Sequence, residues 1–225
     1  MAFEQSQNQN SRWGVAGLFL LKVGLVLLLS CVTAVAYLAL RSHDPVYVLR
    51  ELKDWTDYRR FDSLIVKVAR EYDLDPRLIK AVVWRESRFQ ADMIGRNGER
   101  GLMQVSEFAA RDWAAAKGLP DPHPEQLLVP EINLQVGTWY LSKAVQRWNG
   151  EDDAVPFALA EYNAGRSRVD RWVRTAVQKG QPVTAQTFQD SIDFPSTARY
   201  VRTILSRYDF YKRRGPLVAG DQGSS

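Results

Sequence analysis

The sequence predicts a mainly α-helical protein in which a single transmembrane helix precedes one helical domain. An uncharged, apolar stretch runs from Val23 to Leu40. Beyond residue 58, apolar side chains recur every three to four residues, and no stretch alternates convincingly between apolar and polar side chains as a strand would. The only cysteine is Cys31, so we expect neither a disulfide framework nor a cysteine nucleophile in the domain.

The apolar stretch is long enough for one membrane crossing, because Val23 to Leu40 would span about 27 Å as a helix that rises about 1.5 Å per residue. Lys22 can extend its amine toward the headgroups and lengthen the segment on its N-terminal side. Two processed forms stay open: cleavage by signal peptidase after Ala34-Val35-Ala36, and a lipoprotein with a lipidated Cys31. An uncleaved anchor is the form we favour.

These features divide the chain into consecutive parts. We expect a cytoplasmic tail (1–12), a transmembrane anchor (13–40), a spacer (41–57), a helical domain (58–212) and a disordered tail (213–225). Within the domain, apolar periodicity predicts helices over residues 59–72, 76–88, 106–117, 130–149, 153–162, 166–177 and 195–212. The Gln-rich stretch from Thr175 to Asp193 is expected to be a long connection.

Start signals and helical faces support these helices. Asp75 and Pro76 are a typical N-cap and first residue for the helix 76–88. In the last helix, the periodicity predicts an apolar inner face of Tyr200, Val201, Ile204, Leu205 and Tyr208. The same spacing predicts that four basic side chains point mainly outward: Arg199, Arg202, Arg207 and Lys212.

Glu86 is the strongest candidate for a catalytic residue. Apolar side chains of the helix 76–88 and of Phe89 fill an arc of roughly 140°, and Glu86 falls near the middle of that arc. Burial disfavours the ionised form and raises the pKa, which suits a general acid that holds a proton near pH 7. The alternative is a structural glutamate whose charge is satisfied by an arginine or by backbone donors.

Polar side chains that can hold a sugar follow Glu86 along the chain. Gly95, Gly98 and Gly101 predict a tight connection that brings Gln104 back toward Glu86. Further on, Tyr162 and Asn163 end an apolar helix just before a glycine. An acid surrounded by such hydrogen-bonding groups is suited to a polar, neutral ligand.

Four motifs in order carry a family resemblance: Glu86-Ser87, Gly101-Leu102-Met103-Gln104, the stretch from Ala160 to Gly165, and the stretch from Phe194 to Val201. At these spacings, about residues 58–212 resemble the catalytic domain of soluble-type (SLT) lytic transglycosylases. That domain has a lysozyme-like fold related to goose-type lysozyme. The segment from Pro130 to Leu141 is also similar to the central helix of this family.

The resemblance implies cleavage of the β-1,4 bond between N-acetylmuramic acid and N-acetylglucosamine in peptidoglycan. Glu86 would act first as acid and then as base, and the product would be a 1,6-anhydro sugar. The implied substrate-binding residues are Ser87, Met103, Gln104, Tyr162, Asn163 and Tyr200. Among these, Gln104 and Tyr162 would line the sugar site, while Ser87 and Asn163 would orient the backbone and loops. No cofactor and no metal are implied.

Three positions depart from the family pattern. Where the family commonly has Ser-Pro-x-Gly-Ala, this chain has Gly95-Arg96-Asn97-Gly98-Glu99. Val105-Ser106-Glu107 replaces Ile-Met-Pro, and Ser196 stands where an acidic residue is common. Glu99 is therefore a second carboxylate that could activate water. Its alternative is a solvated charge paired with Arg96 or Arg100.

The implied partners are the glycan strands of peptidoglycan, and the cytoplasmic membrane through residues 13–40; partners in cell-wall or secretion machinery stay open. We therefore expect a single-pass protein of the bacterial inner membrane with a periplasmic domain. The net charge of +4 is mild, and no nucleic-acid motif is present. His43 and His123 lie too far apart in the chain to favour a metal site. Two alternatives remain, a non-catalytic peptidoglycan-binding scaffold and a muramidase-type hydrolase.

Overall fold

The computed structural model describes residues 20–34, 36–37, 57–151, 153–178, 180 and 182–217. The chain divides into two compact units, Met1–Thr56 and Asp57–Ser225. The predicted tail 1–12, most of the predicted spacer 41–57 and residues 218–225 lie outside the described residues.

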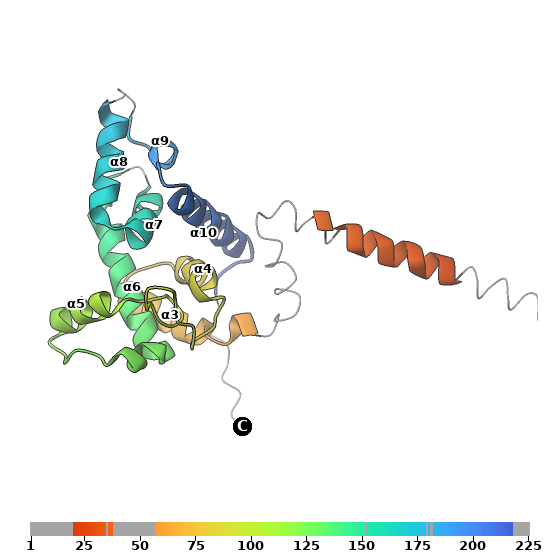
Figure 1. Cartoon of the computed structure of the whole chain (residues 1–225), viewed down its shortest axis with the longest axis horizontal. Helices are drawn as coiled ribbons and strands as arrows, with labels where there is room; N and C mark the ends of the chain where they lie inside the picture. Colours follow the sequence, from red (N-terminus) through yellow and green to blue (C-terminus); the bar gives the residue numbers. More distant parts are fainter. Residues whose placement is uncertain are drawn as a thin grey trace, which may run out of the picture. The chain divides into compact units, whose positions relative to one another are not determined.

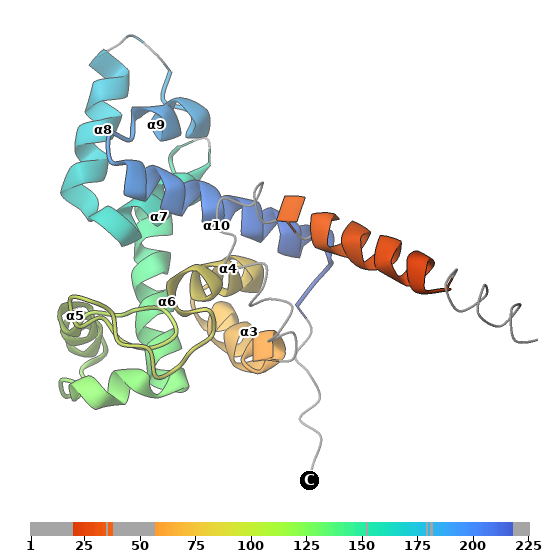
Figure 2. The same cartoon turned by 45° about the vertical axis from the view of Figure 1, so that its right-hand side comes forward.

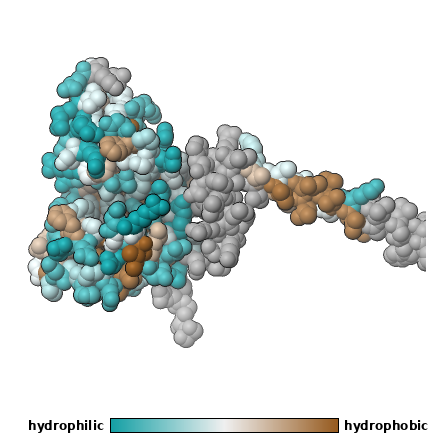
Figure 3. Space-filling view, viewed as in Figure 1, coloured by the Kyte–Doolittle hydropathy of each residue, from teal (hydrophilic) through white to brown (hydrophobic). Residues whose placement is uncertain are grey.

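The first unit contains a helical segment, residues 20–34 and 36–37. Figure 3 shows its apolar surface in brown, and its large exposed apolar side chains are Leu20, Leu21, Val23, Leu25, Val26, Leu27, Leu28, Leu29, Val32 and Tyr37. The predicted anchor 13–40 extends beyond the described residues at both ends. Within the described part of the chain, no helix is both long and apolar enough to cross a membrane.

The second unit is helical throughout its described part, apart from loops and two isolated bridges, Ile94 with Arg100 and Arg100 with Val105. Its elements, drawn in Figure 1, are η1 Asp57–Arg59, α3 Asp62–Glu71, α4 Pro76–Ser87, α5 Glu107–Lys117, η2 Pro124–Leu128, α6 Pro130–Arg147, α7 Ala154–Ala164, α8 Arg166–Gln178, α9 Ala185–Ser191 and α10 Pro195–Arg213. The mainly α-helical fold class of the domain is therefore confirmed.

Most predicted helix boundaries agree with the structure to within one or two residues, but the expected long connection before Asp193 is wrong. It contains α9, Ala185–Ser191, whose N-cap is Thr184: the Thr184 side chain accepts a hydrogen bond from the backbone N–H of Thr187. Phe188 of this short helix is fully buried and stacks on Phe157 of α7, with ring centroids 4.0 Å apart. Tertiary packing thus stabilises a helix that is too short to show periodicity.

The core lies where α4, α6, α7 and α10 meet. α4 packs against α3 and α10, and α7 packs against both α6 and α10. In Figures 1 and 2, α8 and α9 lie together at one end of the domain, and α3 and α5 lie at the other. Large side chains with almost no exposure fill the centre, among them Ile79, Leu134, Leu141, Phe157, Leu159, Trp172 and Ile204.

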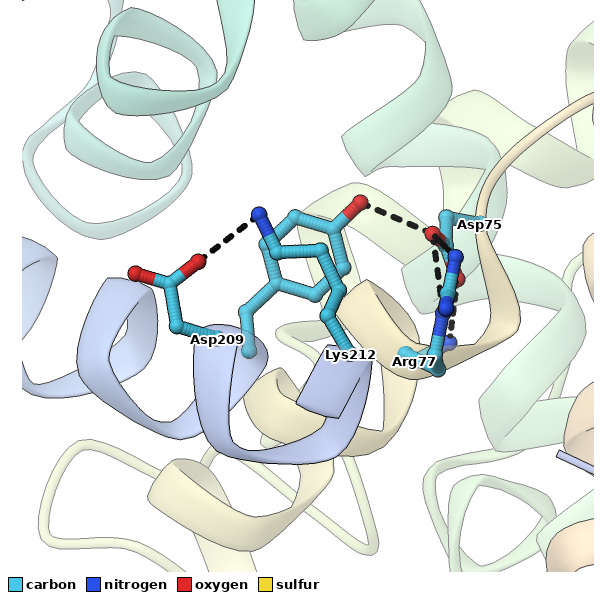
Figure 4. Close-up of polar contacts among 5 residues, drawn as sticks. Asp75, Arg77, Asp209 and Lys212 are labelled. Atoms are coloured by element: carbon cyan, nitrogen blue, oxygen red, sulfur yellow. Dashed lines mark hydrogen bonds and ion pairs between the residues drawn. The ribbon is translucent and has the colours of Figure 1, made fainter. Parts of the chain in front are cut away.

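Asp75 connects the start of α4 to α10. As predicted, it caps the helix, since its side chain accepts a hydrogen bond of 2.8 Å from the backbone N–H of Arg77. The carboxylate also pairs with the Arg77 guanidinium at 2.7 Å and accepts a 2.8 Å hydrogen bond from the Tyr208 hydroxyl of α10 (Figure 4). Nearby on α10, Lys212 pairs with Asp209 at 2.7 Å (Figure 4). The N-terminus of the helix that carries Glu86 is thereby fixed to the last helix.

The predicted outer face of the last helix is wrong at one position. Arg199, Arg202 and Lys212 are exposed, but Arg207 is only 7% exposed. Its guanidinium lies 4.1 Å from the centroid of the Trp84 ring of α4. A planar guanidinium can stack on an aromatic face, which lets an arginine occupy the interface between the two helices.

Candidate active site

Glu86 lies in the last turn of α4, which ends at Ser87. The backbone then turns sharply, because Arg88 and Phe89 both have left-handed conformations with φ of 54° and 64°. The Tyr200 hydroxyl of α10 donates a hydrogen bond of 2.6 Å to Glu86 Oε1. The interface of α4 and α10 therefore positions the carboxyl group.

Burial raises the pKa of Glu86 to about 7, whereas the Tyr200 hydrogen bond and the charge of Arg85 act in the opposite direction. The negative charge of Glu99 raises it further. Among the described residues, no donor bonds to the second oxygen, Oε2. Since Oε1 accepts from Tyr200, Oε2 is the oxygen left for the proton of the neutral acid.

Two tyrosines lie beside this acid and are neutral at pH 7. Burial and the nearby charge of Glu86 raise the pKa of both Tyr162 and Tyr200 well above the usual value. The Tyr162 hydroxyl, at the end of α7, donates a 2.9 Å hydrogen bond to the carbonyl of Met103. When Glu86 holds its proton, these neutral hydroxyls and the acid make a polar but uncharged environment.

The connection between α4 and α5 forms a compact loop, residues 93–105. Arg100 and Val105 exchange backbone hydrogen bonds of 3.0 and 2.9 Å, and the Gly101 N–H donates to the Met93 carbonyl at 2.8 Å. Gln104 has a left-handed φ of 47°, and its side-chain amide donates to the carbonyls of Met93 and Gly101 at 3.2 and 3.0 Å. The predicted tight connection at the three glycines is present.

Asn133 holds this loop, and the sequence reasoning missed it. Its fully buried side chain, on α6, accepts from the Met103 N–H at 2.8 Å. Its amide donates to the carbonyls of Arg100 at 2.7 Å and Leu127 at 2.6 Å. The signal in the sequence was an asparagine between Ile132 and Leu134 in an apolar helix, where a buried polar side chain must find hydrogen-bond partners.

The structure separates the remaining predicted residues by what they contact. Ser87 is buried and donates to the Leu102 carbonyl at 2.8 Å, which ties the loop to the end of α4. Asn163 is exposed, and its side-chain oxygen accepts a 2.8 Å hydrogen bond from Thr197.

Met103, a predicted substrate-binding residue, lies inside the domain. Its side chain has no exposure and packs on Gly137 of α6, where an added Cβ would lie 2.6 Å from the sulfur. The predicted substrate contact of Met103 stays a prediction; in this structure its side chain is enclosed, and its backbone carbonyl accepts a hydrogen bond from Tyr162.

The positions that depart from the family pattern also have clear contacts. Glu99 accepts hydrogen bonds from Asn97, not from Arg96 or Arg100. Ser106 caps α5, since its side chain accepts from the Ala109 N–H at 3.2 Å. Asp193, an acidic residue three positions before Ser196, accepts a 2.6 Å hydrogen bond from the Trp172 indole. Within the described residues, no group of three or more His, Cys, Asp or Glu could hold a metal ion.

Fold and site together define a lysozyme-like helical domain built around an acid. The transglycosylase SLT domain family matches residues 63–183, and the chain belongs to this family. The soluble lytic murein transglycosylase of Salmonella typhimurium is 32% identical over 154 residues, which are 68% of this chain and 23% of that protein. The membrane-bound lytic murein transglycosylase F of Desulfosudis oleivorans is 27% identical over 181 residues, covering 71% of this chain and 38% of the relative.

Solved structures have the same fold. An inactive mutant of the lytic transglycosylase Slt from Pseudomonas aeruginosa superposes with a TM-score of 0.60 and 29% identity, covering 70% of this chain and 25% of that one. The soluble lytic transglycosylase SLT70 from Escherichia coli gives a TM-score of 0.65 over 82% of this chain and 30% of that one, and at 24% identity it shows the fold alone. The chain spans about a quarter of the length of the soluble relatives that it matches.

Proposed function

We propose that this protein is a membrane-anchored peptidoglycan lytic transglycosylase that cleaves the β-1,4 bond between N-acetylmuramic acid and N-acetylglucosamine. The observation that carries the proposal is Glu86, with a pKa of about 7 and a 2.6 Å hydrogen bond from Tyr200. A carboxyl group with this pKa exists in both protonation states near neutral pH. It can therefore donate a proton in one step and accept one in the next.

In the first step, the proton on Glu86 Oε2 passes to the glycosidic oxygen as its bond to C1 of N-acetylmuramic acid breaks. The electron pair of that bond goes to the leaving oxygen, and the substrate's own N-acetyl group supports the positive charge at C1. In the second step, the Glu86 carboxylate takes the proton of the C6 hydroxyl, and the C6 oxygen of the sugar bonds to C1. This closes the 1,6-anhydro ring and restores the acid.

Gln104 and Tyr162 are the side chains that we propose to line the sugar site, with Ser87 and Asn163 orienting the loops around it. The neutral state of Tyr162 suits an uncharged sugar, and the hydroxyl is held by the Met103 carbonyl at 2.9 Å. Tyr200 would orient Glu86 and keep the proton on the oxygen that faces the substrate. This assignment rests on the resemblance of these residues to the family motifs and, for Tyr200, on its hydrogen bond to Glu86.

The catalytic test compares Glu86→Gln with the exposed control Glu125→Gln by mass spectrometry of muropeptides released from purified peptidoglycan. We expect the natural chain and the control to release products lighter than hydrolytic ones by one water molecule. The Glu86→Gln variant should keep the fold and lose about 10²–10⁴-fold in rate, since its amide cannot donate the acid proton. Among the relatives, a glutamate-to-glutamine mutant of the Pseudomonas aeruginosa enzyme is described as inactive.

The same assay distinguishes the two alternatives. Only reducing-end products would make the protein a muramidase-type hydrolase. Binding of peptidoglycan without any cleavage would make it a scaffold, and either result would contradict the proposed reaction.

Residues 13–40 are proposed as an uncleaved inner-membrane anchor, which would leave residues 1–12 in the cytoplasm and the domain 58–212 in the periplasm. The apolar side chains of residues 20–34 are exposed. The hydroxyls of Ser30 and Thr33 donate to the carbonyls of Val26 and Leu29 at 2.8 and 2.9 Å. Such internal bonds satisfy polar groups where lipid offers no partner.

Fractionation of cells tests the anchor. The full chain should remain with membranes after an alkaline wash, and a double change of Leu27 and Leu28 to arginine should release it. The Cys31→Ser variant should stay membrane-bound. Loss of binding in Cys31→Ser would indicate the lipoprotein form, and a full chain in the soluble fraction would refute anchoring.

A further inference from the structure

Glu99 is a carboxylate that the single-acid reaction does not use, yet its side chain is held in place. Oε2 accepts a hydrogen bond of 3.1 Å from the Asn97 N–H, and Oε1 accepts one of 2.9 Å from the Asn97 side-chain amide. Each oxygen has one protein donor and a further lone pair for a water molecule. The residue is only partly buried, so water can reach it.

Gly95 provides the space for this carboxylate. A Cβ at Gly95 would lie 2.6 Å from Glu99 Oε2 and equally 2.6 Å from Gln104 Oε1. The two side chains therefore converge over the same glycine. A residue with a side chain at position 95 would have to displace one or both of them. The position of the Glu99 carboxylate therefore depends on glycine at position 95.

The loop that carries Glu99 is fixed to the candidate active site at two points. Ser87, the neighbour of Glu86, bonds to the Leu102 carbonyl at 2.8 Å, and Tyr162 bonds to the Met103 carbonyl at 2.9 Å. Gln104, whose side chain converges with that of Glu99, is the next residue after Met103. Glu99 thus belongs to the same loop and the same side of that loop as a residue proposed to contact the sugar.

The electrostatic states of the two carboxyl groups are complementary. The Asn97 hydrogen bonds lower the pKa of Glu99, while burial raises that of Glu86, and the charge of Glu99 adds to the latter effect. Near pH 7 Glu99 is ionised, while a substantial fraction of Glu86 still holds its proton. Glycosidases that use water rely on such a pair, an acid for the leaving oxygen and a base for the water.

We propose that Glu99 is a catalytic base that gives this enzyme a second, hydrolytic outcome alongside formation of the anhydro sugar. The inference rests on the proposed function of Glu86. In this branch Glu86 donates its proton to the leaving oxygen, and Glu99 takes a proton from a water molecule. The water oxygen bonds to C1 as the C1–O bond breaks. Glu86 is then ionised and Glu99 protonated, and proton exchange with solvent restores the starting states.

The experiment digests purified peptidoglycan with the full-length protein in H₂¹⁸O, followed by immediate borohydride reduction and mass spectrometry. The reduction stops exchange at reducing ends once the digestion ends, so label above the background marks bonds cut by water. The natural chain is compared with Glu99→Gln, Asn97→Ala and the control Glu107→Gln, whose side chain is about half exposed. Glu86→Gln supplies the background of label, and circular dichroism verifies that each variant is folded.

We expect the natural chain and Glu107→Gln to release both anhydro products and ¹⁸O-labelled reducing ends. Glu99→Gln should lose about 10²-fold of the labelled product, the usual contribution of a general base, and keep the anhydro product. Asn97→Ala should reduce the labelled product in the same direction. Anhydro products without label from the natural chain, or equal label in Glu99→Gln, would overturn the role of Glu99 while leaving the proposed function intact. The absence of all products would overturn both.

Discussion

Replacing Tyr200 by phenylalanine tests how the protein controls its acid. The change removes only the hydroxyl that donates to Glu86 Oε1 at 2.6 Å, and leaves the buried ring in place. That hydrogen bond favours the ionised carboxylate and lowers the pKa of Glu86 against the larger effect of burial. Its loss should therefore raise the pKa above the present value of about 7.

The size of the shift follows from the strength of the bond. A hydrogen bond to a charged group contributes about 1.5–3 kcal/mol, and one pKa unit corresponds to about 1.4 kcal/mol, so the expected shift is about one to two units upward. Because the acid must be protonated to react, kcat/KM falls as the pH rises through this pKa. The alkaline limb of the profile should move to higher pH by the same amount, whatever happens to the maximal rate.

The assay is kcat/KM against pH, with release of muropeptides as the readout, because this ratio reports ionisations of the free enzyme. Tyr162→Phe is the matched control, since that hydroxyl donates to the Met103 carbonyl and not to Glu86. The control can lower the rate but should leave the alkaline limb in place. An unmoved limb in Tyr200→Phe, or one at lower pH, would refute this account of the acid.

Two further predictions concern the stability of the loop. Asn133→Ala leaves the Met103 N–H and two carbonyls without their partner. At about 1–3 kcal/mol for each unsatisfied group, the free energy of unfolding in urea should fall by about 3 kcal/mol or more, whereas the exposed Asn149→Ala should change it by less than about 0.5 kcal/mol. Similar small effects in both would mean that Asn133 does not hold the loop. Gly101→Ala should cost more than Gly118→Ala, and equal unfolding midpoints would argue against the packing described. Both glycines have a positive φ, which costs another residue about 1–2 kcal/mol, but only at Gly101 would the methyl group overlap Asn133 and the Leu127 carbonyl.

Features that depend on local signals were predictable from the sequence. The helix α4 follows from Asp75 and Pro76, and Glu86 is noticeable because a carboxylate occupies an apolar position of that helix. Periodicity could not reveal Arg207, because its burial depends on stacking against Trp84 of another helix. The resemblance implied that Tyr200 belongs to the site, but its hydrogen bond to Glu86 depends on how α4 and α10 pack. The contacts of Asn97 with Glu99 depend likewise on the loop conformation.

The way Asn133 and Ser87 hold the loop 93–105 has an evolutionary consequence. Both side chains bind backbone atoms, namely the N–H of Met103 and the carbonyls of Arg100 and Leu102. Such bonds form regardless of the side chains carried by the loop. Changes at exposed loop positions without backbone constraints, such as Arg96, can therefore accumulate while the loop keeps its conformation, whereas Gly95 and the positive-φ Gly98 are constrained.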